Sequence, residues 1–162
     1  MEFDTAILNQ IISDYEQSGV ISAAELDWLE NAVLSGAVHG LSGQGLPLLG
    51  MKAKTKLFES NFYALETVRI LALNGRKERM QAMIEPMLER LRQKCYGSFC
   101  ATGECFETSV CVLRFLRAVC PWETKWIGQM EAGIRAHRGD KIRTKAVERY
   151  IETALRTENT KE

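Results

Sequence analysis

A run of apolar residues between Gly103 and Pro121 is the feature that most limits how this chain can fold. Apolar side chains recur there every three or four residues, the spacing of one face of an α-helix, at Phe106, Val110, Leu113, Leu116 and Val119. Val112, Phe115 and Cys120 widen that face, so we expect the helix to be buried on more than one side. Pro121 cannot donate the next backbone hydrogen bond and is expected to end it.

Two further helices are predicted at the start of the chain. Residues 3–18 and residues 22–35 both carry apolar side chains at helical spacing, and a very short connection separates them. Ser22 followed three residues later by Glu25 has the pattern of a capping box, which begins a helix. The sequence therefore predicts an N-terminal helical hairpin.

The same periodicity continues through the rest of the chain. Asn61 is the predicted N-cap of the next helix, and Pro86 is expected to kink or split the one after it. Helices are predicted over 62–74, 77–94, 122–137 and 141–156. We find no convincing strand, so the predicted fold is all-α, with about seven helices as stacked antiparallel hairpins in a bundle or a short repeat-like array. At 162 residues we expect a single helical domain, 1–162, with a frayed tail at 157–162.

The charges are balanced in total but not along the chain. Formal net charge is zero, which favours neither a nucleic-acid partner nor a membrane surface. Residues 1–75 carry four Lys/Arg against nine Asp/Glu, or −5, and residues 76–149 carry fifteen against nine, or +6. Solvated helix faces explain this asymmetry most simply; the alternative is an anionic partner on the basic half.

Several features indicate a cytoplasmic protein. No apolar run approaches the roughly 20 residues that span a bilayer. The first ten residues, MEFDTAILNQ, lack the basic start of a secretory signal. Five cysteines without an export signal predict reduced thiols, and the odd number fits poorly with a complete set of disulfides.

The segment 36–50 differs in composition from the predicted helices. It contains five glycines and one proline among four leucines, together with His39. Its GLSGQG sequence matches neither the phosphate-binding loop of nucleotide triphosphatases nor the dinucleotide-binding fingerprint. We therefore expect an ordered Gly/Leu-rich loop that packs on the body and lines a pocket.

All five cysteines fall between residues 95 and 120, spaced C-x4-C-x4-C-x5-C-x8-C. Cys95, Cys100 and Cys105 flank a turn and are the metal-site candidates, with His39 or His137 as a further ligand of zinc or an Fe–S cluster. No C-x2-C pair is present, so buried, unreactive cysteines remain the favoured interpretation, and no cofactor is predicted. Thiol redox chemistry is the other alternative.

Basic side chains supply the candidate ligand-binding residues. Arg114 and Arg117, one turn apart on the predicted helix after Gly103, are expected to form a basic strip with arginines and a lysine of the preceding helix. With the loop histidine, the candidates are His39, Arg90, Lys94, Arg114 and Arg117. No catalytic residue is predicted, because neither histidine can be paired with a nucleophile from the sequence.

A small residue followed two positions later by glutamate recurs four times at intervals of 41 residues, each time in the early part of a predicted helix. The four glutamates are Glu25, Glu66, Glu107 and Glu148. A period of about 40 residues with two helices per unit is typical of stacked helical hairpins. Regular spacing in an ordinary helical bundle is the alternative.

Residues 61–116 also carry a family resemblance. Gly97-Ser98-Phe99 is expected to form a turn between two predicted helices, and Glu107-Thr108 is expected to lie at the start of the second. This segment, about a third of the chain, resembles a repeat pair of the α/α-toroid superfamily, which includes terpene cyclases and protein prenyltransferase β subunits. The resemblance implies stacked helical hairpins. The aspartate-rich motif of the cyclases is absent, and the zinc ligands of the transferases cannot be located, so no activity is implied.

These observations give three hypotheses for function. The first is a non-catalytic helical protein-binding or adaptor module with a groove between hairpins, whose partner is another protein or a second copy. The second is a small-molecule-binding protein or enzyme with a pocket under the 36–50 loop. The third is a metal- or redox-responsive protein that uses the cysteines of the 95–105 turn.

Overall fold

A computed structural model describes residues 4–35, 56–92 and 105–156. Within these ranges the chain forms seven α-helices and one short 3-10 helix, and no strand, which confirms the all-α prediction. The elements, in chain order, are α1 (Thr5–Ser18), α2 (Ala23–Leu34), α3 (Lys56–Leu73), the 3-10 helix η1 (Lys77–Met80), α4 (Gln81–Leu91), α5 (Cys105–Val119), α6 (Thr124–His137) and α7 (Lys145–Leu155).

Local capping explains why the N-terminal hairpin begins and turns where it does. The Asp4 carboxylate accepts the backbone N–H of Ala6 at the start of α1. Ser22 and Glu25 form the predicted capping box at the start of α2. Between the two helices Gly19 has φ of 74°, a left-handed conformation that favours glycine at a helix C-terminus.

Two predicted details of the next helices are wrong. α3 begins at Lys56 and not after Asn61, which lies inside the helix. Of the two alternatives for Pro86, the split is wrong: α4 continues through the proline, and the change from 3-10 to α-helix comes earlier, between Met80 and Gln81. A kink at Pro86 stays a prediction. Ile84 and Leu88, on either side of the proline, are both buried and anchor both turns to the core.

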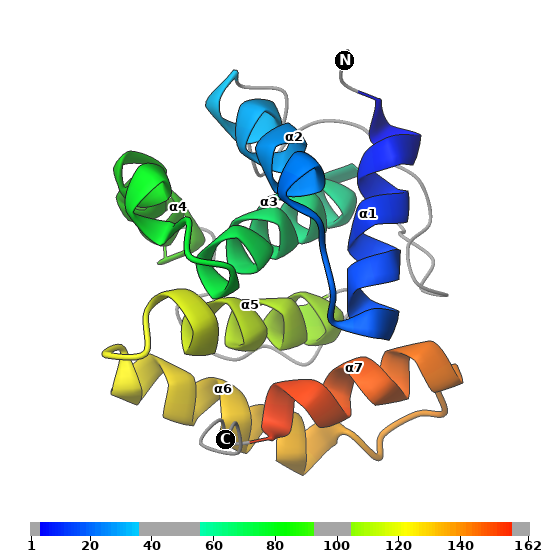
Figure 1. Ribbon diagram of the computed structural model, residues 1–162. Helices are drawn as coiled ribbons and strands as arrows, with labels where there is room; N and C mark the ends of the chain where they lie inside the picture. Colours follow the sequence, from blue (N-terminus) through cyan, green and yellow to red (C-terminus); the bar gives the residue numbers. More distant parts are fainter. Residues whose placement is uncertain (1–3, 36–55, 93–104, 157–162) are drawn as a thin grey trace.

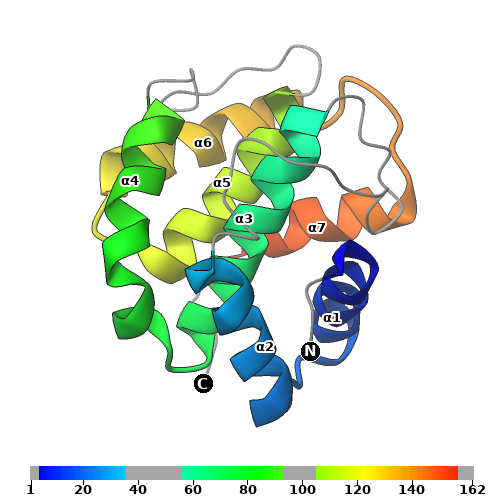
Figure 2. The same ribbon diagram turned by 90° about the horizontal axis from the view of Figure 1, so that it is seen from above.

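The helices are arranged around α3 and α5, which pack against each other in the middle of the molecule (Figure 1). The α1–α2 hairpin contacts α3, whereas α6 and α7 lie on the opposite side of α5. Viewed from above, α2 lies between α1 and α4 (Figure 2). The hairpin therefore forms an outer layer over the central helices.

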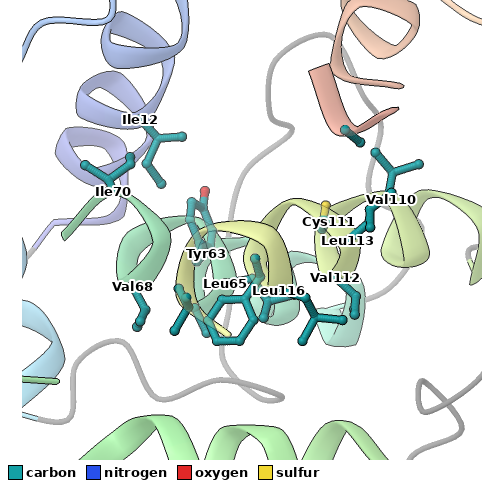
Figure 3. Close-up of a cluster of buried hydrophobic side chains, with 14 of the residues drawn as sticks. Ile12, Tyr63, Leu65, Val68, Ile70, Val110, Cys111, Val112, Leu113 and Leu116 are labelled. Carbon is teal, nitrogen blue, oxygen red and sulfur yellow. The ribbon is translucent and has the colours of Figure 1, made fainter. Parts of the chain in front are cut away.

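The side chains between these helices form one apolar cluster that draws on every helix. Its centre is the contact between α3 and α5, where Leu65 lies close to Leu116 (Figure 3). Burial of α5 is nearly complete, from Phe106 through Cys120, as its wide apolar face predicts.

Helices α5 and α7 run in the same direction, because their starts lie beside each other and so do their ends. Arg143, just before α7, lies over the ring of Phe106, and Arg117 near the end of α5 donates from Nε to the carbonyl of Ala154 at 3.0 Å. Arg117 thereby supplies a hydrogen bond to the C-terminal turn of α7, where carbonyls have no partner within the helix.

The glutamates of the 41-residue period do not occupy one equivalent position. Glu25, Glu107 and Glu148 lie in the first turns of α2, α5 and α7. Glu66 lies in the middle of α3, which begins ten residues earlier. The repeat and the toroid resemblance stay predictions, and the Gly97–Phe99 turn lies outside the described residues.

None of the described helices is both long enough and apolar enough to cross a lipid bilayer.

Candidate functional site

A buried charged centre lies where α1, α3, α5 and α7 meet. Arg114 of α5 is only 3% exposed. Its Nη2 atom lies 2.7 Å from Oε1 of Glu16 in α1 and 3.7 Å from Oε1 of Glu66 in α3. The guanidinium carbon lies 3.6 Å from the centre of the Tyr150 ring of α7, a cation–π contact. One arginine therefore joins three other helices to α5.

The charges in this centre are balanced. Glu66, which is 1% exposed, also accepts a hydrogen bond from Arg69 at 3.1 Å. Two arginines and two carboxylates thus lie together, which is the condition under which charges are tolerated in a protein interior. Burial alone would lower the pKa of Arg114, but Glu66, Tyr150 and Glu16 together outweigh it and hold that pKa above its ordinary value. Arg114 is therefore a permanent cation.

The centre also contains hydrogen-bonding atoms that no described residue satisfies. These are Oε2 of Glu66 together with Nε and Nη1 of Arg114. A buried polar atom without a partner costs about 1–3 kcal/mol, and more when it is charged. An acceptor and two donors are therefore open to a small polar molecule, of which water is the simplest.

The N-terminal hairpin is acidic throughout. Residues 4–35 contain six carboxylates and no lysine or arginine. Asp4 and Glu25 cap their own helices, and Asp14 accepts a hydrogen bond from Gln10. The remaining three, Glu16, Asp27 and Glu30, form ion pairs with the body of the protein.

Those carboxylates form ion pairs with three arginines, Arg76, Arg79 and Arg114, which we call the arginine clamp. Arg76 Nη1 lies 2.8 Å from both Asp27 and Glu30. Arg79 Nη1 lies 3.0 Å from Glu30, and Arg114 holds Glu16. Each pair joins the hairpin to a segment far away in the chain.

Glu30 is expected to make this attachment sensitive to acid. A hydrogen bond from Arg76 lowers the pKa of Glu30, burial opposes it, and Arg79 adds to the lowering. A carboxyl group whose pKa is lower in the folded state binds fewer protons there than in the unfolded chain. Its stabilising contribution is therefore complete above about pH 4.5, the ordinary value, and is lost as the pH falls through the lowered folded-state pKa.

We expect the Glu30→Gln variant to lose less stability than the wild type between about pH 5 and pH 3, because its side chain does not titrate. Urea unfolding followed by circular dichroism at several pH values measures this difference. Glu78→Gln, at an exposed position of η1, is the matched control and should keep the wild-type pH dependence. Parallel pH profiles for wild type and Glu30→Gln would contradict the prediction.

The candidate ligand-binding residues are not gathered at one surface. Arg114 is buried, which excludes it from a solvent-exposed basic strip, and Arg117 contacts Glu131 at 2.9 Å as well as the end of α7. Arg90 lies in α4, but its side chain is outside the described residues, as are His39 and Lys94 altogether.

The metal hypothesis stays a prediction. Cys95 and Cys100 lie outside the described residues, and Cys105 begins α5 with a side chain that is not described. His137 is engaged by Asp140, whose Oδ2 lies 2.8 Å from Nδ1. Residues 4–35, 56–92 and 105–156 contain no group of three or more His, Cys, Asp or Glu side chains that could hold a metal ion.

Cys111 and Cys120 are expected to resist alkylation while the chain is folded. Both are free and buried. Burial raises the pKa of Cys111, and it raises the pKa of Cys120 to about 11, so neither thiol ionises readily at neutral pH. Iodoacetamide should modify both at least about 100-fold more slowly in the folded chain than in urea, as peptide mapping by mass spectrometry would show. Equal rates in the two states would contradict this.

A second feature lies at the turn between α5 and α6. Trp122 is 55% exposed, and Lys77 Nζ lies 4.5 Å from its ring centre. Nearby in sequence, the buried Trp126 is covered by Arg92, which also pairs with Glu123 at 2.7 Å. These cation–π contacts join both ends of the η1–α4 segment to the start of α6.

The sequence did not identify Glu16, Glu66 and Tyr150 as site residues. Periodicity alone assigns a helical glutamate to the solvent-exposed face and a helical tyrosine to the core. A usable signal was present. Glu66 lies in a mainly apolar stretch of the predicted helix, directly after Leu65, and a buried carboxylate requires a buried cation. The absence of basic residues from 4–35 was a second signal.

No family model, curated protein or solved structure matches this chain.

Proposed function

We propose that this protein is a non-catalytic helical binding module that recognises an acidic helical segment of another protein. The binding surface in this proposal is the face of α3 that the N-terminal hairpin covers, together with the arginine clamp. The observation that carries the proposal is that this face already holds such a segment, the chain's own hairpin, by ion pairs with all three arginines of the clamp.

The contacts of the hairpin indicate which kind of partner helix the proposed binding surface recognises. On α1, Leu8 and Ile12 are buried one turn apart, and Glu16 follows one turn later on the same side of the helix. The apolar pair packs on the body, with Ile12 close to Ile70 of α3 (Figure 3), and the carboxylate pairs with Arg114. A partner helix of this type has two apolar residues and then a carboxylate at four-residue intervals.

The chemistry of the buried centre favours binding over catalysis. Its arginines and carboxylates form ion pairs with one another, and burial raises the pKa of Cys111 beside them, which makes that thiol a poor nucleophile. Free thiols at Cys111 and Cys120 also suit a reducing compartment, and we propose the cytoplasm.

A labelled synthetic peptide of residues 1–35 would test this function on the full-length chain. In the wild type the attached hairpin competes at an effective concentration in the millimolar range, so we expect little binding of micromolar peptide. In the variant Glu16→Gln/Asp27→Asn/Glu30→Gln the body keeps its three arginines but holds its own hairpin more weakly. Fluorescence anisotropy should then show that the native peptide binds this variant at least about tenfold more tightly than it binds the wild type.

The matched control is a peptide that carries the same three substitutions. It should bind the variant at least about tenfold more weakly than the native peptide, and added salt should reduce this difference. Equal binding of the two peptides would show that the carboxylates do not direct recognition. Failure of the native peptide to bind a triple variant whose circular dichroism is unchanged would reject the proposed function, and Glu16→Gln alone provides a milder second variant.

A further inference from the structure

We propose that the outer face of α7, together with the loop before it, binds the surface of a membrane that contains anionic lipids. The residues that form this surface make none of the described contacts with the N-terminal hairpin. α7 also lies in the layer on the other side of α5 from the hairpin (Figure 1). The lipid-binding surface is thus additional to the proposed protein-binding surface, and each can be tested without the other.

Most arginines of the described residues already have a partner. From Arg69 to Arg143, every arginine whose side chain is described forms an ion pair with a carboxylate. Four exposed cations in α7 and beside it differ, because their side chains form no ion pair, hydrogen bond or ring contact with a described residue: Lys141, Lys145, Arg149 and Arg156. Their charges are therefore available to an anionic partner.

The outer face of α7 is positively charged. Lys145 and Arg149 lie one turn apart on this side of the helix, whereas its apolar residues are buried on the other side, at Val147, Tyr150, Ile151, Ala154 and Leu155. The two carboxylates of α7, Glu148 and Glu152, lie 3.2 and 3.0 Å from Nη2 of Arg138, which offsets part of their charge. Residues 138–156 carry six Lys/Arg against three Asp/Glu, or +3.

The loop before α7 adds an exposed apolar side chain to these cations. Ile142 is 98% exposed, more than any other large hydrophobic residue of the described ranges. It follows Lys141 directly and precedes Lys145 by three residues. An aliphatic side chain among cations can insert at the boundary between lipid headgroups and acyl chains. A nucleic acid would engage the cations through its phosphates and gain little from an aliphatic side chain, so an anionic lipid surface is favoured.

The expected association is reversible and depends on the charge of the lipid. Each Lys or Arg close to an anionic leaflet tightens binding about fivefold, so four of them would favour anionic over neutral vesicles by up to about 600-fold. Added salt should reduce this preference, because it screens charges that are exposed to water. Attachment of this kind takes place at the membrane surface and requires no membrane-crossing helix.

Cosedimentation of the full-length chain with lipid vesicles tests this surface. Vesicles of phosphatidylcholine and phosphatidylserine should remove the protein from solution at millimolar lipid, whereas vesicles of phosphatidylcholine alone should not. Lys145→Gln/Arg149→Gln should bind the anionic vesicles about 25-fold more weakly, from two losses of about fivefold. Ile142→Ala should bind them at least about threefold more weakly, because alanine buries less apolar surface among the lipids.

The matched controls are two single lysine variants. Lys145→Gln should weaken binding about fivefold. Lys125→Gln removes an exposed cation at the start of α6, the end of that helix farther from α7 (Figure 1), and should bind as the wild type does. Unchanged circular dichroism confirms that each variant is folded. Equal losses for the two lysine variants would overturn the proposal, as would wild-type protein that stays in solution with the anionic vesicles.

A nucleic-acid partner is distinguished by a fluorescent DNA duplex in place of the vesicles. Binding of this duplex that is unchanged in Ile142→Ala, together with no binding to anionic vesicles, would assign the cations to nucleic acid and overturn the lipid surface. Binding of the 1–35 peptide is measured without lipid, so loss of vesicle binding leaves the proposed function standing.

Discussion

Replacement of Arg114 by leucine is expected to reduce the free energy of unfolding by about 3–5 kcal/mol. The substitution leaves Glu66 in the interior with Arg69 as its remaining described partner, and it leaves Glu16 without its cation. A buried carboxylate that loses its partner must either remain charged in a medium of low dielectric or take up a proton. Urea unfolding at neutral pH, followed by circular dichroism, measures the loss.

Arg117→Leu is the matched control on the same helix. Its partner Glu131 retains a second ion pair with Arg135, at 2.9 Å, so we expect a loss of only about 1 kcal/mol. Combining Arg114→Leu with Glu66→Gln should recover part of the stability, because the uncompensated charge is then removed. Equal losses for the two arginine variants would show that the buried centre contributes no more than a surface pair.

Truncation of Phe115 to alanine is expected to have an effect of similar size. Phe115, in the C-terminal half of α5, is fully buried in the apolar core. Removal of a buried phenyl ring loses its transfer free energy and leaves a cavity, which together destabilise by about 3–5 kcal/mol. For a domain of this size the midpoint of thermal unfolding should fall by roughly 6–20 °C, at about 2–4 °C per kcal/mol.

Two control variants distinguish the loss of packing at Phe115 from a general sensitivity of the protein to substitution. Phe115→Leu keeps most of the apolar volume and should lose much less stability. Ile142→Ala changes a side chain that is 98% exposed, and its effect should lie within about 0.5 kcal/mol of zero. If truncation of Phe115 were as mild as the change at Ile142, α5 could not be the centre of the core.

The sequence was sufficient to predict the helices wherever apolar spacing and a terminal signal agreed. The Ser22–Glu25 capping box and the end of α5 before Pro121 are both predicted from adjacent residues and both confirmed. The start of α3 is different. Asn61 resembles a cap, but the preceding residues include lysine, leucine and glutamate, which favour helix, and no glycine or proline interrupts them. Continuation of the helix therefore outweighs a single capping side chain.

The candidate site was predictable only in part. Arg114 was selected as a candidate because it is basic, and periodicity alone assigns an arginine to the surface. Its actual position depends on Glu66 and on Glu16, which is 98 residues away in the chain. Local patterns contain no information about partners so distant, whereas the uneven distribution of charge, −5 against +6, did reflect the ion pairs between the acidic hairpin and the basic body.

The distance in sequence between the hairpin and the arginine clamp has a consequence during synthesis on the ribosome. The acidic hairpin is translated before Arg76, Arg79 and Arg114, the last of which follows the end of α2 by 80 residues. At about 5–20 residues per second, roughly 4–16 s pass before the last of these cations has been added. During that interval the apolar face of each nascent hairpin has no complete receiving surface on its own chain. The hairpin can therefore complete its ion pairs with the arginine clamp only late in synthesis, after Arg114 of α5 has been added.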